Sequence, residues 1–170
     1  MNGMTTSHGK DGLSPDTDDA GGNDGRIVQV RPASCEDAAA LAHLLGQLGY
    51  PTVVAEAAHR LALWHATPRS VVLTGVLGTE VCGVAAVHAI PLLERPGLRG
   101  RLVALVVAEA ARGRGLGHAL MDAAEAQARQ WECLEMEITS SHDRTTAHHF
   151  YKQLRYHDTN DHALRFIKAL

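Results

Sequence analysis

Apolar and polar positions alternate along this chain with two different periods, which divide it into strands and helices. Short runs rich in Val, Ile and Leu, with apolar side chains at every second position, predict β-strands. Longer runs with apolar side chains at every third or fourth position predict helices. The expected strands span residues 27–31, 70–76, 80–89, 102–107, 133–139 and 163–168. The expected helices span about residues 38–48, 53–66, 117–130 and 145–154.

The order of these elements is β, α, α, β, β, β, α, β, α, β, which predicts a mixed sheet with helices on its faces. The chain has 170 residues, a length that suits one domain with a sizeable core. Residues 1–25 are rich in Gly, Asp, Ser and Thr and almost lack large apolar side chains. Such a segment cannot bury enough surface to offset the entropy of ordering. We therefore expect a disordered tail followed by one domain over residues 26–170.

Local signals mark the ends of several elements. The segment from Ser34 to Asp37 resembles a capping box, and Gly49 is expected to end the first helix. The second helix is expected to turn five side chains inward: Val54, Ala57, Ala58, Leu61 and Trp64. The connection over residues 91–100 is polar and contains Pro and Gly, which predicts a mobile loop near the functional site.

A glycine-rich turn between the strand at 102–107 and the next helix carries the clearest chemistry. Gly113, Gly115 and Gly117 lie where the strand ends and the helix begins. At a helix start, unpaired backbone N–H groups and the positive end of the helix dipole favour an anion, and glycines let the backbone approach it closely. Arg112 and Arg114 add positive charge. The turn therefore predicts a phosphate or pyrophosphate site.

Spacing separates three phosphate-binding motifs that compete for this turn. A P-loop ends in Gly-Lys-Ser/Thr, whereas residues 117–119 are Gly-His-Ala. A dinucleotide fingerprint starting at Gly113 needs Gly or Ala at the position of His118, and it needs a βαβ unit that the flanks do not provide. The third pattern, Arg-x-x-Gly-x-Gly, is met by residues 112–117. A plain strand-to-helix turn with surface arginines remains the alternative.

This third pattern resembles the coenzyme A pyrophosphate loop of the GNAT superfamily of N-acetyltransferases. A second motif supports the resemblance: residues 138–151 form a strand, a loop and a helix ending in Ala-x-x-Phe-Tyr, followed by Leu-x-Tyr at residues 154–156. The resemblance covers nearly all of residues 26–170. It implies an α/β fold of the α+β type, with a mixed, mostly antiparallel sheet flanked by helices on both faces in a single domain.

The resemblance also implies that acetyl-CoA is the cosubstrate, and it assigns the contacts. Backbone N–H groups of the central strand would bind the pantetheine arm and polarise the thioester carbonyl, and those of the turn would bind the pyrophosphate. The residues concerned are Leu105, Val106, Val107, Arg112, Gly113, Arg114, Gly115, Leu116, Gly117 and His118. Arg144 stands where many members have an asparagine that contacts the pantetheine arm or the acceptor region. An arginine there can instead meet a phosphate or an anionic acceptor.

Acetyl transfer needs a neutral amine, stabilisation of the carbonyl oxygen and a proton for the departing thiolate. Tyr151 matches the superfamily tyrosine proposed to protonate the sulfur, and a core aromatic is the alternative. Many members have an acidic residue in the central strand, but residues 103–105 supply none. Histidine side chains in general titrate near neutral pH, so His88 and His142 are candidates to remove the proton, while surface or structural histidines and a water chain are the alternatives.

The composition limits the kinds of partner and ligand that we expect for this chain. The formal net charge of −3 offers no basic footprint for nucleic acid and no polybasic membrane anchor. The three cysteines lack a Cys-x-x-Cys spacing, which favours reduced thiols in the cytoplasm, and the N-terminus has no signal-peptide pattern. The eleven histidines include no His-x-x-x-His pair and no cysteine partner, so we expect no metal.

The sequence therefore predicts a cytoplasmic N-acetyltransferase in which a bound amine attacks acetyl-CoA directly. A small primary amine is the first expectation for the acceptor, and a protein N-terminus or lysine is the second. The resemblance places acceptor contacts at Gln47, Tyr50 and residues 91–100. A non-catalytic acyl-CoA-binding module is the alternative from another class, favoured by the missing strand carboxylate. The resemblance also makes a homodimer plausible, because members of the family often pair through sheet edges or the C-terminal region.

Overall fold

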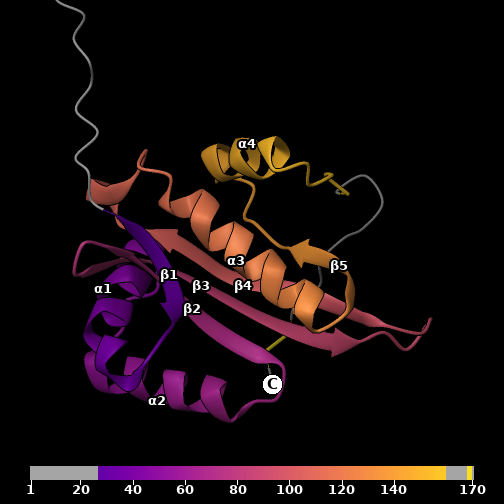
Figure 1. Ribbon diagram of the computed structural model, residues 1–170, viewed down its shortest axis with the longest axis horizontal. Helices are drawn as coiled ribbons and strands as arrows, with labels where there is room; N and C mark the ends of the chain where they lie inside the picture. The colour runs from indigo at the N-terminus through magenta and orange to yellow at the C-terminus, as the bar shows by residue number, and fades with distance from the viewer. Residues whose placement is uncertain (1–26, 160–167, 170) are drawn as a thin grey trace, which may run out of the picture.

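In the computed structural model, which describes residues 27–159 and 168–169, five strands form one sheet in the order β1-β2-β3-β4-β5 (Figure 1). The strands are β1 (Val28–Pro32), β2 (Ser70–Leu77), β3 (Glu80–Pro91), β4 (Leu98–Val107) and β5 (Cys133–Ile138). The first four pair antiparallel with their neighbours, and β4 pairs parallel with β5. The predicted mixed, mostly antiparallel sheet is therefore confirmed. The predicted tail and residues 163–167 of the predicted last strand lie outside the described residues.

Helices cover both faces of the sheet (Figure 1). The helices are α1 (Ala38–Leu48), α2 (Val54–Ala66), α3 (Leu116–Gln130) and α4 (Thr145–Gln153), with short 3₁₀ turns η1 (Cys35–Asp37) and η2 (Glu109–Ala111). Leu44 of α1, Leu61 of α2 and Val84 of β3 belong to one buried cluster. Leu120 and Met121 of α3 belong to a second cluster on the opposite face, against which α4 packs its half-buried side chains. Two apolar layers thus enclose the sheet.

A buried carboxylate links β1 to the start of α1 through hydrogen bonds. Asp37, which is 6% exposed, accepts two hydrogen bonds from the Arg31 guanidinium (2.7 and 2.8 Å) and one from the Ser34 backbone N–H (2.7 Å). The Ser34 bond is the one expected from the capping-box pattern. The Arg31 hydrogen bonds, followed by the Ser34 backbone bond, hold the pKa of Asp37 below its usual value despite the opposing effect of burial.

Changing Asp37 to Asn is expected to lower the free energy of unfolding by about 1–3 kcal/mol at pH 7, because the charge-assisted bonds are lost. Since the folded pKa is depressed, this contribution is present at neutral pH and is lost as pH falls below about 4. Urea unfolding at pH 7 and pH 3 measures both effects. Glu36→Gln, at an exposed neighbour, is the control and should change stability by less than about 0.5 kcal/mol. Equal losses in the two variants would contradict the assignment.

Two expectations about α2 are wrong. Val54 is 51% exposed and Ala58 is exposed, although both were expected to face inward. The helix contacts its neighbours through a narrower stripe, in which Ala57 and Leu61 are buried and Trp64 is partly buried. These three positions follow the i, i+4, i+7 spacing of one helix face. The helix lies against α1 and β2, and this stripe carries its apolar contacts with the buried cluster.

The predicted mobile loop over residues 91–100 is also wrong in its extent and its place. β3 continues to Pro91 and β4 begins at Leu98, so only residues 92–97 connect them. Arg95 of this connection and Arg99 of β4 both pair with Glu135 of β5, so ion pairs with the neighbouring strand hold polar side chains of the segment. The connection adjoins the first residue of β4, whereas the glycine turn follows the last. It is therefore distant from the turn along the strand.

Candidate active site

β4 and β5 separate partway along their length and form a fork. They pair in parallel from Leu98 opposite Cys133 to Leu102 opposite Ile138, where β5 ends. β4 continues to Val107, still paired with β3 on its other edge. Within the described part of the chain, the outer edge of β4 beyond Leu102 therefore has no strand partner. Backbone groups on such an edge are available to a ligand.

The direction of the backbone groups on this edge follows from one hydrogen bond. The Ala108 N–H donates to the Cys82 carbonyl of β3 at 2.7 Å. Because successive N–H groups on a strand point to opposite edges, those of Leu105 and Val107 point into the fork and that of Val106 points toward β3. The Val106 side chain is buried beside α1 and α2. Of the three strand residues expected to contact the coenzyme, two thus offer donors to the fork.

The glycine turn begins a few residues after the fork. Gly113 (φ 76°) and Gly115 (φ 79°) have left-handed backbone conformations that other residues adopt only with strain. A Cβ atom at either position would meet no heavy atom within 4 Å, so the glycines are required by conformation and leave open space. The Arg112 side chain is exposed, and its Nε donates to the Val107 carbonyl at 3.4 Å.

The start of α3 provides the donors of the predicted phosphate site. Gly115 is the N-cap, with no side-chain cap, and its carbonyl accepts the Ala119 N–H at 3.1 Å. The N–H groups of residues 116–118 come before the donor of this first helical hydrogen bond. They therefore have no acceptor within the helix and point out of its N-terminus. Leu116 is 1% exposed, which limits its part in binding to the backbone. The His118 ring stacks edge-on with Phe150 of α4, with centroids 5.0 Å apart.

Two strand glycines, which the sequence analysis did not connect with the site, set the position of this helix start. Gly75 of β2 and Gly83 of β3 are opposite each other in the sheet. A Cβ atom on Gly75 would lie 2.8 Å from Leu116 Cδ1, and one on Gly83 would lie 2.8 Å from Leu120 Cδ1. The missing side chains therefore let the first turns of α3 pack directly on the sheet. A glycine inside a predicted strand is the signal that marks such a close approach.

Changing Gly83 to Val is expected to lower the free energy of unfolding by about 1–3 kcal/mol, because the added side chain overlaps Leu120 and the Val106 carbonyl. The same displacement of α3 is expected to weaken coenzyme binding, measured by calorimetric titration of acetyl-CoA. Gly46→Ala is the control, since its added Cβ meets nothing within 4 Å on the surface of α1. That control should be about 1 kcal/mol more stable than the wild type. A stable Gly83→Val protein would contradict the packing argument.

Tyr151 lies in α4, on the side that packs against the α3 cluster. Its ring is tilted against Phe150 (5.6 Å between centroids) and is edge-on to Tyr156 (6.1 Å). Burial raises the pKa of the Tyr151 phenol, opposed in part by the positive charge of Arg144. The hydroxyl therefore keeps its proton at neutral pH, as a proton donor must.

Arg144 links the start of α4 to the end of α1. Its guanidinium Nη2 donates to the Leu48 carbonyl at 2.6 Å, at the end of α1, while its own residue is the N-cap of α4. A cation beside the last carbonyls of a helix is favoured by the helix dipole. On the same side, the Gln47 side-chain oxygen accepts the Glu109 N–H at 3.0 Å, just after β4. Neither contact across the chain was visible in the sequence.

The two histidines proposed as bases lie in different places. His142 is exposed in the loop over residues 139–144, which continues from β5 at the open end of the fork. His88 of β3 lies opposite Arg101, which is four residues, or roughly 13 Å, before Leu105 along β4. Burial, followed by the charge of Arg101, lowers the pKa of His88, whose ring is edge-on to Trp64. His142 therefore lies on the segment that continues from the fork, whereas His88 is separated from β5 by β4, near the last strand pair.

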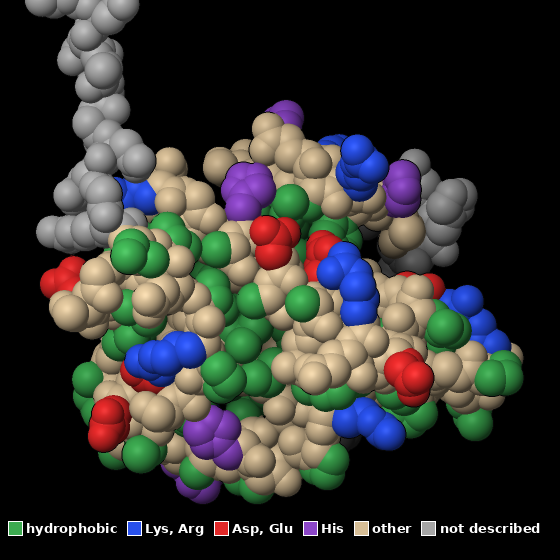
Figure 2. Space-filling view, in the orientation of Figure 1, with side chains coloured by type: hydrophobic (Ala, Val, Ile, Leu, Met, Phe, Trp, Pro, Cys, Tyr) green, Lys and Arg blue, Asp and Glu red, His purple; other side chains and the backbone are tan. Residues whose placement is uncertain are grey.

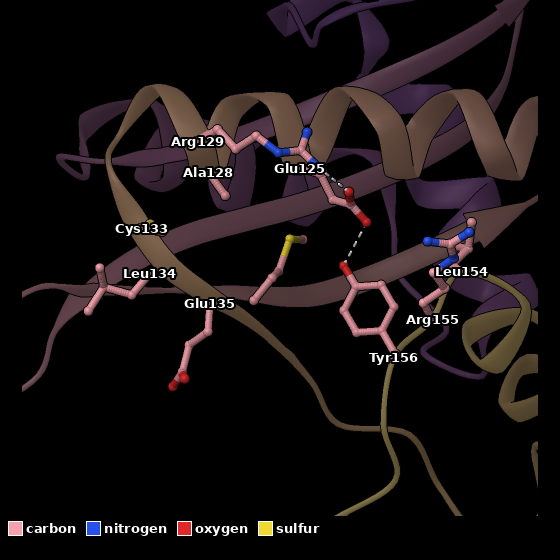
Figure 3. A pocket seen from close by; sticks show the side chains of 10 residues that line it. Glu125, Ala128, Arg129, Cys133, Leu134, Glu135, Leu154, Arg155 and Tyr156 are labelled. Atoms are coloured by element: carbon pink, nitrogen blue, oxygen red, sulfur yellow. Dashed lines mark hydrogen bonds and ion pairs between the residues drawn. The ribbon is translucent and has the colours of Figure 1, made fainter.

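A separate hollow of about 260 Å³ lies between the second half of α3, β5 and the residues after α4 (Figure 3). There the Tyr156 hydroxyl donates to Glu125 Oε1 at 3.0 Å, and Arg129 binds the other oxygen of Glu125 at 2.6 Å. The polar groups of Tyr156, Glu125 and Arg129 are therefore paired with one another. The hollow is at the opposite end of α3 from the glycine turn, so it is distinct from the fork.

Surface charge and the grouping of possible metal ligands say little about which ligand the protein binds. On the face shown in Figure 2, positive and negative side chains are interspersed. Among residues 27–159 and 168–169, no three His, Cys, Asp or Glu side chains are grouped closely enough to hold a metal ion. The helices of the same residues include none with the length and apolar character needed to span a membrane.

This chain belongs to the acetyltransferase (GNAT) family, whose model matches residues 39–156. The fork, the glycine turn and the fold described above agree with that membership. Acetyl transfer is therefore the chemistry that the family supports for this chain in general terms. A search by sequence finds no significant match among curated proteins.

Solved structures share the fold at low identity. A transcriptional regulator from Bacillus halodurans is 23% identical, with a TM-score of 0.73 over 84% of this chain and 100% of that one. A glucosamine-6-phosphate N-acetyltransferase from Arabidopsis thaliana is 18% identical (TM-score 0.70, 84% and 98%). An aminoglycoside 6'-N-acetyltransferase from Acinetobacter haemolyticus is 19% identical (TM-score 0.71, 84% and 99%). The two acetyltransferases are named for different acceptors, so the shared fold does not choose one.

Proposed function

We propose that this protein transfers the acetyl group of acetyl-CoA to the primary amine of a small molecule. The observation that carries the proposal is the continuity of the site: the strand edge opened by the fork leads through η2 directly into the glycine turn. A ligand whose pyrophosphate binds the start of α3 can lay a long arm along β4. Coenzyme A has this shape, with its thioester at the far end of the arm.

The proposed reaction forms a bond between the amine nitrogen and the acetyl carbon, while the C–S bond breaks and the sulfur gains a proton. The N–H groups of Leu105 and Val107 are assigned to the pantetheine arm and the carbonyl oxygen, where developing negative charge needs donors. The turn over residues 112–118 is assigned to the pyrophosphate. Tyr151 is assigned as the donor of the proton to sulfur.

The amine must lose a proton before it attacks. Of the two histidines, His142 is the better candidate to remove it, because its loop begins where the fork opens. His88 and a water chain remain the alternatives. Arg144 is assigned to the rim of the site, where its guanidinium can contact the coenzyme or an acceptor. The small-molecule acceptor, the homodimer and the cytoplasmic location remain predictions.

Two measurements on the wild-type protein test this function. Calorimetric titration of acetyl-CoA should show micromolar binding, and thiol release should then depend on an added amine. A panel of small amines and of peptides with free N-termini or lysines separates the acceptor classes. Binding without release on any amine would favour a non-catalytic acyl-CoA-binding module. Absence of binding would reject the proposal.

A further inference from the structure

β5 carries two glutamates, whereas residues 103–105 of β4 carry no carboxylate. On β5, Met136 and Ile138 pack toward α3, so Glu135 and Glu137 point to the opposite face of the sheet. Glu137 is opposite Arg101, and the next pair along, Leu102 and Ile138, is the last before the strands separate. Glu137 therefore lies beside the opening of the fork, on the face away from α3.

The two glutamates are held very differently by the arginines of β4 and its preceding loop. Glu135 accepts hydrogen bonds of 2.6 Å from both Arg95 and Arg99. The contacts of Glu137 are longer, at 3.4 Å to Arg99 and 3.6 Å to Arg101. Since a carboxylate has about four acceptor positions, Glu137 retains capacity for another donor. Its side chain is 37% exposed, so a ligand can reach it.

We propose that Glu137 binds the ammonium group of the acceptor as it enters the fork. The inference rests on the proposed function, in which the coenzyme lies on the side of α3 and α4. With the thioester held against that side, the acceptor is placed on the opposite face, where the Glu137 side chain is 37% exposed; Val103, just past the last strand pair, is 52% exposed. Glu137 is the carboxylate next to this entrance.

This position selects an acceptor by charge. An aliphatic amine has a pKa near 10 and is a cation at neutral pH, so it can donate charge-assisted hydrogen bonds to a carboxylate. The ion-pair network around Glu137 includes Arg95, Arg99, Arg101, Glu94 and Glu135, and His88 is opposite Arg101 in the sheet. The Arg101 side chain also donates to Thr139 Oγ1 at 3.3 Å. Basic aliphatic amines are therefore the acceptor class that fits.

The test compares Glu137→Gln with Glu135→Gln, a matched variant two residues earlier on the same strand and face. Thiol release is measured with ethylamine, which is charged at neutral pH, and with 2,2,2-trifluoroethylamine, which is not. Glu137→Gln should lower kcat/KM for ethylamine about ten- to hundredfold, mainly through KM, and should change the value for trifluoroethylamine less than threefold. Glu135→Gln should change both values less than threefold, and acetyl-CoA affinity should stay constant in all proteins.

Two results would overturn the assignment of Glu137 alone: equal effects of the two substitutions, or equal loss on the charged and uncharged amines. A purely structural role for the ion pairs would give the second of these, together with a lower melting temperature. No thiol release by the wild type with either amine would instead overturn the proposed function, and the role of Glu137 with it.

Discussion

Changing Gly115 to Glu is expected to weaken acetyl-CoA binding at least about a hundredfold, which corresponds to about 2.7 kcal/mol. Two effects act together. The backbone at Gly115 has φ 79°, so any side chain strains the turn that presents the first N–H groups of α3. A carboxylate at the N-cap also places negative charge where the pyrophosphate should bind. Calorimetric titration of acetyl-CoA measures the loss.

Two further variants separate these effects. Gly115→Ala introduces strain without charge and should have a smaller effect, of about tenfold. Gly46→Glu adds the same carboxylate to the exposed surface of α1, where a Cβ meets nothing within 4 Å, and should bind acetyl-CoA like the wild type. Full affinity in Gly115→Glu, with the folded spectrum retained, would mean that the coenzyme does not use this turn.

The sequence predicted the elements well because each one carries its own periodicity. The end of α1 at Gly49 and the end of α3 at Gln130 agree with local glycine and apolar signals. The error at residues 91–100 has a physical cause. Polar residues and a proline resemble a loop, but here the polar side chains are stabilised by ion pairs with the neighbouring strand. Such pairing joins residues nearly forty positions apart, which a local pattern cannot show.

The fork could be expected from the family resemblance but not from periodicity. It depends on where β5 ends relative to β4, which is a matter of register between distant segments. A β-bulge adds to the difficulty: Ala104 pairs with Ala86 and Leu102 with Val87, so Val103 is an extra residue. The bulge shifts the alternation of faces along β4. A search of β4 alone for a carboxylate does not reach Glu137, the residue proposed above, because it lies on β5 and points to the face opposite α3.

The packing of α4 against the buried cluster of α3 determines the surroundings of Tyr151. In the sequence it shares a helix side with apolar residues, and this pattern fits a core aromatic as well as a proton donor. The structure leaves it half-buried, with its pKa raised by burial. Both descriptions therefore apply: the ring packs, and the hydroxyl keeps a proton. Only kinetics can separate the contribution of the hydroxyl from that of the ring.

Changing Tyr151 to Phe is expected to lower kcat about a hundred- to thousandfold while leaving acetyl-CoA affinity within twofold. The ring contacts with Phe150 and Tyr156 remain, but the proton donor for the sulfur is lost. Because the pKa of this phenol is raised, the wild type should lose no activity through it until pH exceeds about 10. Amine-dependent thiol release as a function of pH measures both expectations.

Tyr156→Phe is the matched control. It removes a neighbouring hydroxyl that donates to Glu125 at 3.0 Å in the hollow beside α3, not in the fork. This change should lower the free energy of unfolding by about 1 kcal/mol and leave kcat nearly unchanged. The opposite pattern, with kcat lost in Tyr156→Phe and kept in Tyr151→Phe, would move the proton donor elsewhere. Equal small losses in both would mean that Tyr151 acts through packing, and that the sulfur receives its proton from solvent.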